Sequence, residues 1–360
     1  MTLSSSEKTR FARHLTLSQM GEAAQETLKQ SRVLIIGMGG LGCPALLYLA
    51  AAGVGHISIM DFDVVESSNL QRQILFEDAD LGLFKAEIAA LKVQKLHFYQ
   101  NIQGLVCRFD EHSMDILQNF DLVLDCTDGI ASKFFINDAA VFFEKPLVYA
   151  AANQFEGCLS VFNYKGGPNY RDLYPEQPKA SEVPGCAENG ILGAFVGVLG
   201  SMQATEAIKC LLNKPKILTG KLLFINALDW QTRIFKFISH GKKITARPVL
   251  GLEKSSCESV PKINTEILLS WYKASYDVLL VDVREVYERV EMLPKAQAWA
   301  WSEWQHKTEP LLPFAHTDSQ KLVFYCQSGV RSHKAALKFL EAGHSEVYNL
   351  GGIQDWGDLL

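Results

Sequence analysis

Arg32-Val33-Leu34-Ile35-Ile36-Gly37-Met38-Gly39-Gly40-Leu41-Gly42 is the stretch that decides the fold of the longer part of this chain. Its apolar, largely β-branched first half predicts a buried strand. The glycines of its second half predict a tight loop at the start of a helix, where the backbone can approach phosphate groups closely. An apolar helix over 44–52 and a second strand over 56–60 would complete a β-α-β unit. The candidate phosphate-binding glycines are Gly37, Gly39, Gly40 and Gly42.

A carboxylate follows the glycine loop at the spacing of a nucleotide site. Asp61 lies about twenty residues further on, at the end of the second predicted strand, where a carboxylate can bind ribose hydroxyls. Another strand, over 122–125, ends at Cys126-Thr127-Asp128. Continuous apolar strands between helices indicate a parallel sheet that is covered on both faces. These features fit NAD and ATP equally well.

Charged residues around the loop favour ATP. The segment Ser68-Asn69-Leu70-Gln71-Arg72-Gln73 is followed by Lys85 and then by Asp128. Adenylyl transfer builds charge on the α-phosphorus and on the departing pyrophosphate, so fixed cations and a metal-binding carboxylate lower its barrier. Taken singly, Arg72 and Lys85 fit solvated surface charges, and Asp128 fits a turn residue. Together with the glycine loop they favour adenylyl transfer over hydride transfer.

The composition bounds the class of protein. The chain has 360 residues, of which 48% are hydrophobic, enough for two cores. A net charge of −5 and an isoelectric point near 6.0 argue against a nucleic-acid partner. We expect no membrane segment, because the apolar runs are far too short to span a bilayer and the N-terminus has no leader-like run. Eight scattered cysteines without a CxxC pair indicate a reducing compartment, and we expect a cytoplasmic protein.

A second, smaller α/β unit follows a polar stretch that contains prolines and glycines and has no periodicity. The sequence predicts a first domain over 1–240, a linker over 241–262 and a second domain over 263–360. The strands expected in the second domain lie over 278–282, 321–325 and 346–350.

The heptad Cys326-Gln327-Ser328-Gly329-Val330-Arg331-Ser332 joins a predicted strand to a helix predicted over 334–341. A tight loop at this place turns successive backbone N–H groups inward. Such a nest, with Arg331 beside it, lowers the pKa of a thiol and would hold a thiolate or a persulfide. The alternative is a buried cysteine that ends a strand. Gly329, Arg331 and Ser332 fall where a cradle needs them, which favours a reactive cysteine.

This loop resembles the active-site loop of single-domain rhodaneses, which carry sulfane sulfur on such a cysteine. The resemblance extends over nearly all of 263–360, from Asp282-Val283-Arg284-Glu285 to 349–353 and Trp356. It departs from the rhodanese pattern at 291–296, which leaves the sulfur cradle intact. We interpret Asp282 and Arg284 as hydrogen-bonding partners of neighbouring loops rather than as catalytic residues.

The first domain resembles the ubiquitin-activating-enzyme-like family over about 8–240. It is most similar to the bacterial enzymes that adenylate small sulfur-carrier proteins for molybdopterin and thiazole synthesis. The motifs that carry this resemblance are GxGGLG at 37–42, DxDxVxxSNLxRQ at 61–73, Lys85, Asp-Cys-Thr-Asp at 125–128 and Arg10-Phe11-Ala12-Arg13.

The resemblance implies a Rossmann-like domain with a mixed sheet, ATP and Mg²⁺ as cofactors, and a homodimer. It implies that Arg13 reaches the phosphates of the neighbouring subunit's nucleotide. It also implies that Gly40 meets the phosphates, that Asp61 binds the ribose, and that Gln73 belongs to the nucleotide-binding set.

The same resemblance gives the charged residues their roles. Asn69, Arg72 and Lys85 would bind the phosphates, and Asp128 would bind Mg²⁺. The family usually has Asn at the next position, where this chain has Gly129, so one contact near the nucleotide is lost or comes from the backbone.

A second departure concerns zinc. The family's structural zinc uses two CxxC pairs, and Asn169 and Asp172 stand at the positions of the first pair. The second pair, expected near 249–257, is absent, and Cys257 alone cannot supply four ligands. We therefore expect no zinc site.

A second candidate cysteine lies in the polar loop before a long apolar helix predicted over 191–212. In the segment 183–190, a Pro-Gly pair leaves Cys186 exposed near helix N–H groups, which favours its thiolate. It matches the cysteine that in several relatives forms a thioester or acyl-disulfide with the activated carrier. The alternative is a small buried residue that anchors the loop. Four other cysteines are expected to be packing residues: Cys43, Cys126, Cys158 and Cys210.

The joined hypothesis is an adenylyltransferase with sulfurtransferase activity. Its partner would be a small ubiquitin-like sulfur carrier ending in Gly-Gly, whose C-terminal carboxylate is adenylated with ATP. Cys326, charged as a persulfide by an upstream donor such as a cysteine desulfurase, would then supply sulfur and leave a thiocarboxylate. Molybdopterin, thiazole and tRNA-thiolation pathways all fit the same residues. The alternatives are a Rossmann redox enzyme with an appended rhodanese domain, and a non-catalytic scaffold that docks a carrier.

Overall fold

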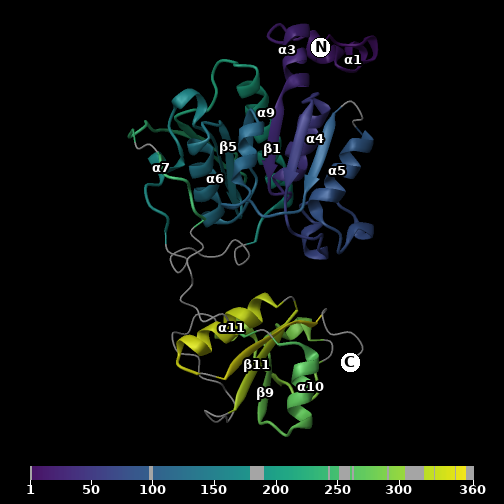
Figure 1. Ribbon diagram of the computed structural model, residues 1–360, viewed down its shortest axis with the longest axis vertical. Coiled ribbons are helices and arrows are strands. Elements are labelled where there is room, and N and C mark those ends of the chain that lie inside the picture. The colour runs from purple at the N-terminus through teal and green to yellow at the C-terminus, as the bar shows by residue number, and fades with distance from the viewer. Residues whose placement is uncertain are drawn as a thin grey trace. The chain divides into compact units, whose positions relative to one another are not determined.

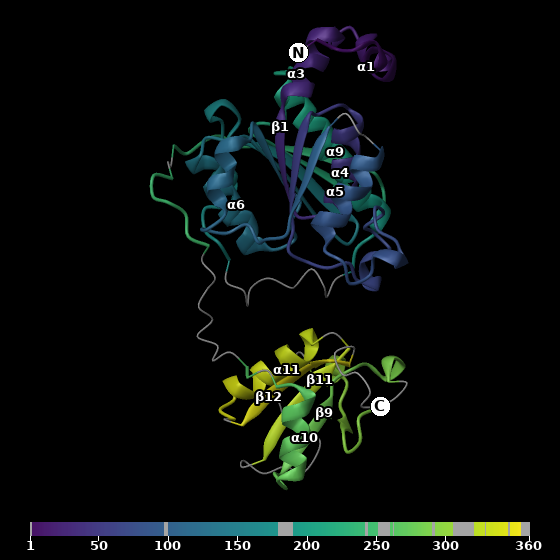
Figure 2. The same ribbon diagram turned by 45° about the vertical axis from the view of Figure 1, so that its right-hand side comes forward.

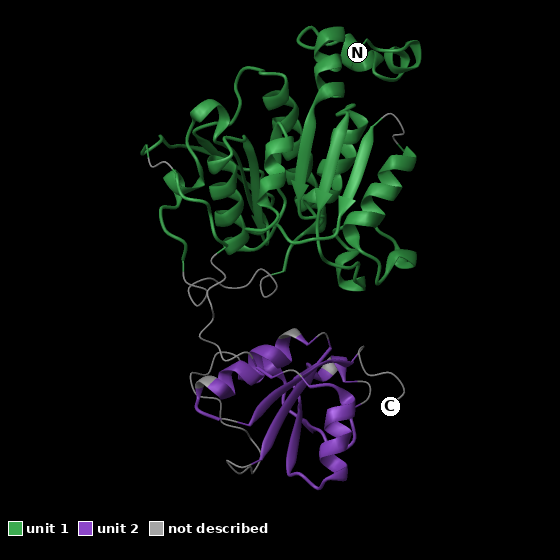
Figure 3. Cartoon of the chain, in the orientation of Figure 1, with its two compact units in different colours: residues 1–251 green, residues 252–360 purple. Residues whose placement is uncertain are grey.

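The computed structural model describes residues 2–96, 100–178, 190–241, 244–250, 260–261, 263–289, 292–304, 320–327, 329–344 and 346–353. Two compact units divide the chain, residues 1–251 and 252–360 (Figure 3). Each unit is an α/β structure, which confirms the predicted fold class (Figures 1 and 2). Among the described residues, no helix has the length and apolar character needed to cross a membrane.

The first unit is built on an eight-stranded sheet in the order β3-β2-β1-β4-β5-β6-β7-β8. The neighbours from β3 to β5 are parallel, and those from β5 to β8 are antiparallel. The sheet is therefore mixed, as the resemblance implied. Its strands are β1 (Arg32–Ile36), β2 (His56–Met60), β3 (Asn101–Leu105), β4 (Leu122–Asp125), β5 (Leu147–Asn153), β6 (Glu156–Phe162), β7 (Lys221–Asn226) and β8 (Thr232–Lys236).

Helices cover both faces of this sheet. In Figures 1 and 2, α6 lies on one side of the strands and α4, α5 and α9 lie on the other. The helices of the unit are α1 (Ser5–Arg10), α2 (Ala12–Leu15), α3 (Gly21–Gln30), α4 (Gly42–Ala51), α5 (Lys85–Leu96), α6 (Ile130–Phe142), α7 (Tyr170–Leu173) and α9 (Gly193–Leu211). Short 3-10 helices are η1 (Ser67–Asn69), η2 (Asp78–Asp80), η3 (Met114–Asn119) and η4 (Tyr164–Gly166).

The continuous apolar run of β1 is explained by burial on both faces. Val33 and Ile35 belong to the core between the sheet and α4, α5 and α9. Leu34 and Ile36 belong to the opposite core, with α6. At the far edge, β8 has all five residues exposed. The packing of the unit extends beyond residue 240, since Leu250 is buried in the α6 core.

The second unit has a parallel four-stranded sheet in the order β10-β9-β11-β12. Its strands are β9 (Val278–Asp282), β10 (Gln297–Ala298), β11 (Lys321–Cys326) and β12 (Val347–Gly352). Its helices are α10 (Thr265–Lys273) and α11 (Val330–Glu341), with short 3-10 helices η6 (Val286–Glu288) and η7 (Trp301–Glu303). The three predicted strands are thus confirmed. The two-residue strand β10 is too short to leave an apolar pattern, and the sequence did not indicate it.

A buried ion pair holds the end of β4. The Lys133 ammonium lies 3.1 Å from Asp125 Oδ2, donates to the Ala150 carbonyl at 3.0 Å, and lies 4.8 Å from the ring centroid of Tyr149. The other oxygen of Asp125 accepts from the N–H and the hydroxyl of Thr127, at 3.0 and 2.7 Å. Both charged groups are nearly inaccessible to solvent. The pair therefore connects β4 to α6 and β5 and fixes the start of the loop that follows β4.

Lys133→Met leaves the Asp125 carboxylate buried without a counter-ion. We expect the free energy of unfolding of the first unit to fall by about 3–5 kcal/mol. Hydrogen exchange of peptides from β4 and β5, recorded as a function of urea concentration, measures the free energy of unfolding of the first unit separately from that of the second. The matched control is Lys236→Met on the exposed strand β8, for which we expect a change below about 0.5 kcal/mol. Equal effects of the two variants would contradict the assignment.

Candidate functional site

The loop between β1 and α4 is so tightly closed that a Cβ does not fit at three of its glycines. Gly37 has φ +94°, and a Cβ there would lie 2.8 Å from the Cys126 carbonyl oxygen. A Cβ on Gly42 would lie 2.2 Å from the Gly37 carbonyl oxygen, and one on Gly40 would lie 2.9 Å from Val196. The glycines therefore allow the loop to fold back on the ends of β1 and β4. This places the start of α4 at the carboxyl edge of the parallel strands, where α/β sheets bind ligands.

Asp61, at the end of β2, is tied to this loop. Its Oδ2 accepts from the Met38 N–H at 2.6 Å, and its Oδ1 accepts from the Asp63 N–H at 2.8 Å. Burial raises the pKa of Asp61, while these backbone hydrogen bonds act in the opposite direction. The carboxylate thus holds the loop conformation, a role that the spacing alone did not indicate. Each oxygen keeps further acceptor capacity for the predicted contact with a ribose.

The predicted phosphate-binding residues come from two segments. Asn69 ends η1, and the N–H groups of Arg72 and Gln73 donate to its carbonyl at 3.0 Å, so one turn carries all three side chains. The Arg72 guanidinium donates to the Ser68 carbonyl at 3.0 Å. Lys85 begins α5 and is buried, with its ammonium 3.2 Å from Asp63 Oδ2. Because Asp63 follows Asp61 closely, Lys85 lies at the same sheet edge as the glycine loop.

Two buried amide oxygens in this region lack a hydrogen-bond partner among the described residues. They are Asn69 Oδ1 and Gln73 Oε1. The Gln73 side-chain nitrogen lies 3.9 Å from the position that a Cβ on Gly39 would take, so this amide lies over the glycine loop. A buried polar atom without a partner costs free energy, and such atoms commonly mark a ligand or water position. The orphaned oxygens therefore fit a nucleotide at this loop.

The loop after β4 carries Asp128 and Gly129, and both residues are exposed. Gly129 is the N-cap of α6, and Asp125 and Lys133 hold the strand end and the first turn on either side. The described residues contain no group of three or more metal-ligating side chains.

The structure does not bring Arg13 to the glycine loop of its own chain. The helices α1 to α3 precede β1 and lie beyond its amino end, whereas the loop lies at its carboxyl end (Figures 1 and 2). Phe11 is buried, and a Cβ on Gly53 would lie 2.7 Å from its ring. This contact fixes the N-terminal helices, while Arg13 stays exposed.

The sulfur loop of the second unit surrounds a fully buried thiol. Cys326 ends β11, and its Sγ accepts from the Gly329 N–H at 3.1 Å. The N–H and the hydroxyl of Ser332 each donate to the same sulfur at 3.4 Å. Gly329 has φ +84°, which favours glycine and turns the chain into α11. Two loop N–H groups therefore point at the sulfur, as the pattern predicted.

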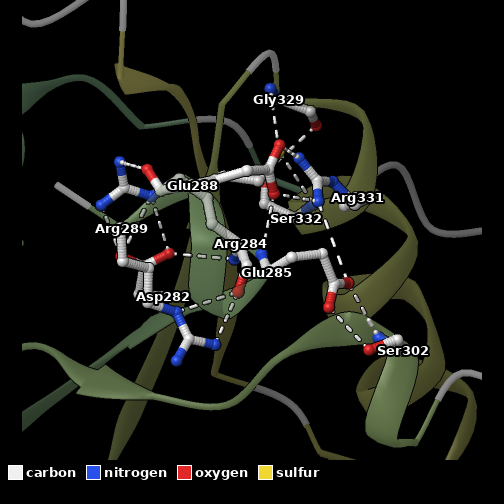
Figure 4. A network of polar contacts seen from close by, with 10 residues as sticks. Asp282, Arg284, Glu285, Glu288, Arg289, Ser302, Gly329, Arg331 and Ser332 are labelled. Carbon is white, nitrogen blue, oxygen red and sulfur yellow. Dashed lines mark hydrogen bonds and ion pairs between the residues drawn. The ribbon is translucent and has the colours of Figure 1, made fainter.

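Charged residues around this loop are paired with one another (Figure 4). Arg331 donates both ends of its fork to Glu288, at 2.5 and 2.7 Å, rather than to the sulfur. Arg284 and Asp282 form a buried bidentate pair at 2.7 to 3.1 Å. The carbonyl of Arg284 in turn accepts from Arg289 at 2.5 and 2.9 Å. Asp282 and Arg284 thus brace the segment after β9: besides pairing with Asp282, Arg284 donates to the Glu288 carbonyl at 3.5 Å.

The second candidate cysteine, the zinc-ligand positions and the packing cysteines remain to be placed in the structure. Cys186 lies outside the described residues, as do Cys257, Ser328 and Trp356. At the positions of the family's first zinc-ligand pair, Asn169 caps α7 and Asp172 completes a capping box. The cysteines expected to pack are buried or half-buried, and burial raises the pKa of each: Cys43 and Cys210 to about 12, with Cys126 and Cys158 also raised.

Sequence reasoning missed two further residues of the framework on the nucleotide side. Lys133 has a local signal, a lysine one turn into the helix that follows an aspartate-ended strand. Gln203 has none, because it lies in α9, yet its amide nitrogen donates to the Asp125 carbonyl at 2.8 Å and its oxygen accepts from Cys126 Sγ at 3.5 Å. Both residues hold the strand end from which the Asp128 loop departs.

Ser332→Ala removes one of the three hydrogen bonds to Cys326 Sγ. Since hydrogen bonds stabilise negative charge on sulfur, we expect iodoacetamide alkylation of Cys326 to slow roughly 2- to 10-fold, the equivalent of about one net hydrogen bond. Peptide mass spectrometry of the alkylated protein measures the rate. Ser270→Ala, whose hydroxyl bonds only within α10, is the control. An unchanged rate in Ser332→Ala would contradict the role given to this hydroxyl.

Comparison with known proteins agrees with both units. The ThiF family model matches residues 11–245, and the rhodanese-like domain model matches 268–359. The chain is 36% identical to the probable adenylyltransferase/sulfurtransferase MoeZ of Mycobacterium tuberculosis, over 98% of this chain and 94% of that protein. It is 42% identical to the adenylyltransferase and sulfurtransferase MOCS3 of Anopheles gambiae, over 98% and 87%.

Solved structures agree with the fold of the first unit. The crystal structure of E. coli MccB superposes with a TM-score of 0.57 at 17% identity, covering 67% of this chain and 73% of that chain. The family resemblance and the enzyme class expected from the sequence are confirmed by the family models and by the relatives' names. The chain belongs to the ThiF family and carries a rhodanese-like domain at its C-terminal end.

Proposed function

We propose that this chain adenylates the C-terminal glycine of a small ubiquitin-like sulfur carrier and converts it to a thiocarboxylate with sulfur carried on Cys326. The observation that carries the proposal is the presence, in one chain, of a ThiF-type glycine loop with two orphaned buried amide oxygens and of a cysteine held in a nest of N–H donors. The names of the similar proteins join the same two activities. A redox function would leave Arg72 and Lys85 without a task.

In the adenylation step, a carboxylate oxygen of the carrier attacks the α-phosphorus of ATP, and pyrophosphate departs. Arg72 and Lys85 offset the charge that grows on the phosphates, and the N–H groups of the loop around Gly40 bind them. Asp61 orients the ribose, while Asn69 and Gln73 supply their unpaired oxygens to donors of the nucleotide or of bound water. Gly129 contributes through its backbone.

Asp128 is the proposed Mg²⁺ ligand. Mg²⁺ would supply charge neutralisation at the phosphates. What this chain contributes is an exposed carboxylate on a loop whose base is fixed by the Asp125–Lys133 pair. This arrangement holds Asp128 at the sheet edge without burying it.

In the sulfur step, the terminal sulfur of a Cys326 persulfide attacks the carbonyl carbon of the acyl-adenylate, and AMP departs. A thiol then attacks Cys326 Sγ in the resulting acyl-disulfide: a new disulfide with Cys326 forms, and the carrier thiocarboxylate leaves with the electron pair of the broken S–S bond. An external thiol reduces the new disulfide before the next turnover. We propose Cys186 for this second step, on the strength of its Pro-Gly context. The persulfide itself would come from a donor protein such as a cysteine desulfurase.

A homodimer would complete the nucleotide site. The support is the position of Arg13, which is exposed and lies at the opposite end of β1 from its own glycine loop. A cytoplasmic location is supported by the six described cysteines, all of which are free. Molybdopterin synthesis, thiazole synthesis and tRNA thiolation all remain candidate pathways, and no zinc is needed for this scheme.

Carrier-dependent exchange between ATP and labelled pyrophosphate tests the first step. We expect exchange only with a carrier that ends in Gly-Gly, and a loss of about 100-fold or more in Lys85→Met, because a fixed cation at the transition state is removed. The matched control is Lys95→Met, an exposed lysine on the same helix α5. Absence of exchange with every candidate carrier would leave a carrier-docking scaffold as the function.

Cys326→Ala tests the second step. We expect this variant to retain pyrophosphate exchange but to lose thiocarboxylate formation, seen by intact-mass analysis as the absence of an oxygen-to-sulfur replacement on the carrier. Carriers are captured with Cys186→Ala and identified among small proteins ending in Gly-Gly. Thiocarboxylate formed at the normal rate by Cys326→Ala would remove the role given to the second unit.

A further inference from the structure

Arg331 is the arginine of the sulfur loop, and the pair of Nη donors at the end of its guanidinium fork is occupied. Nη1 and Nη2 bind the two oxygens of Glu288 at 2.5 and 2.7 Å, and Nη1 lies 3.9 Å from Glu285 Oε1 (Figure 4). A bidentate guanidinium–carboxylate pair uses the same parallel donors that would bind a small oxyanion. The fork is therefore not open to an anionic ligand in this arrangement.

The two carboxylates are themselves fixed. Glu288 accepts from the Glu285 N–H at 2.8 Å, within the capping box of η6. Glu285 accepts from the N–H and hydroxyl of Ser302, at 3.1 and 2.6 Å. Arg331 lowers the pKa of Glu288, so this carboxylate is ionised at neutral pH. The group formed by Glu285, Glu288 and Arg331 has a formal charge of one minus two, or −1.

This group lies beside the reacting sulfur. Arg331 directly precedes Ser332, which gives two hydrogen bonds to Cys326 Sγ. The hydrogen bond from Glu288 raises the pKa of Arg331, so the guanidinium keeps its charge one residue away from the donor to the sulfur. The groups that bind Arg331 therefore also determine the net charge beside Cys326, where a sulfur donor would approach.

We infer that Glu288 is a specificity-determining residue for the sulfur donor: by occupying the fork of Arg331, it disfavours small dianionic donors of the thiosulfate class and favours persulfides carried on a thiol. The inference rests on the proposed function only in that Cys326 carries sulfane sulfur. With either donor, the Cys326 thiolate attacks the outer sulfur and a new S–S bond forms. Thiosulfate would release sulfite, and a persulfide would release a thiolate that keeps the electron pair of the broken S–S bond.

The two donors place different demands on the site. Thiosulfate brings two negative charges, and the leaving sulfite keeps them, so its transfer needs a cation with free donors. A persulfide on an uncharged body brings one charge, located on the sulfur that is transferred. The N–H groups of Gly329 and Ser332 serve that sulfur. Pairing of Arg331 with Glu288 therefore slows sulfur transfer from thiosulfate and leaves transfer from a thiol persulfide unaffected.

Glu288→Gln in the full-length protein tests the inference with two probes, thiosulfate and mercaptoethanol persulfide. Persulfide formation on Cys326 is followed by intact mass, and turnover by transfer to cyanide. We expect kcat/KM for thiosulfate to rise about tenfold or more, the value of a charge-assisted bidentate contact. The value for the persulfide should change less than about threefold. Glu303→Gln, an exposed carboxylate in η7, is the matched control.

The variant Arg331→Met supplies a second measurement, which can be made even if Glu288→Gln does not fold. Because Arg331 is paired in the parent protein, its loss frees no donor, so Arg331→Met should show no gain for thiosulfate. In Glu288→Gln/Arg331→Met the gain for thiosulfate should vanish. A thiosulfate gain in either variant that lacks Arg331, or no gain in a folded Glu288→Gln, would overturn the inference. None of these assays uses ATP or a carrier, so their outcome is independent of the adenylation proposal.

Discussion

A backbone N–H group directed at a side-chain acceptor, in the turn between a parallel strand and a helix, organises both units of this chain. In the first unit the Met38 N–H binds the Asp61 carboxylate, which draws the glycine loop against the end of β2. In the second, the N–H groups of Gly329 and Ser332 bind Cys326 Sγ. The turns differ in what they hold, but each depends on glycine at a point where a Cβ would meet neighbouring backbone or a left-handed φ is required. The chemistry proposed for each unit begins at that turn.

Much of the framework could be predicted from the sequence, because local patterns specify it. The apolar runs of β1 and β4, the glycine loop and the cysteine heptad are short-range signals, and each produced the expected element. The pairings that hold the sites together are long-range. Gln203 reaches the end of β4 from α9, and Glu288 reaches Arg331 across 43 residues. No spacing rule connects such partners, so only the folded chain brings them together.

The departures from the family pattern also have a physical reading. Asn169 and Asp172 cap α7, and the Asp172 carboxylate also accepts from the His240 N–H at 2.7 Å. These hydrogen bonds join α7 to the segment after β8. The two side chains at the positions of the first zinc-ligand pair thus cap α7, and Asp172 also ties α7 to His240 by a hydrogen bond. Gly129, at the other departure, begins α6 with an N-cap that makes no side-chain hydrogen bond.

The exposed edge strand β8 has a consequence for how the protein behaves in solution. Among the described residues, this strand (Thr232-Arg233-Ile234-Phe235-Lys236) pairs only with β7. On its other side, no N–H or C=O group pairs with a described strand, and Ile234 and Phe235 are exposed. Such an edge can recruit a strand from another molecule and start aggregation. Arg233 and Lys236 flank Ile234 and Phe235 with positive charge, and two copies that approach edge to edge would repel each other at these positions. Two basic residues that contribute little to the fold thus disfavour edge-to-edge pairing of two copies.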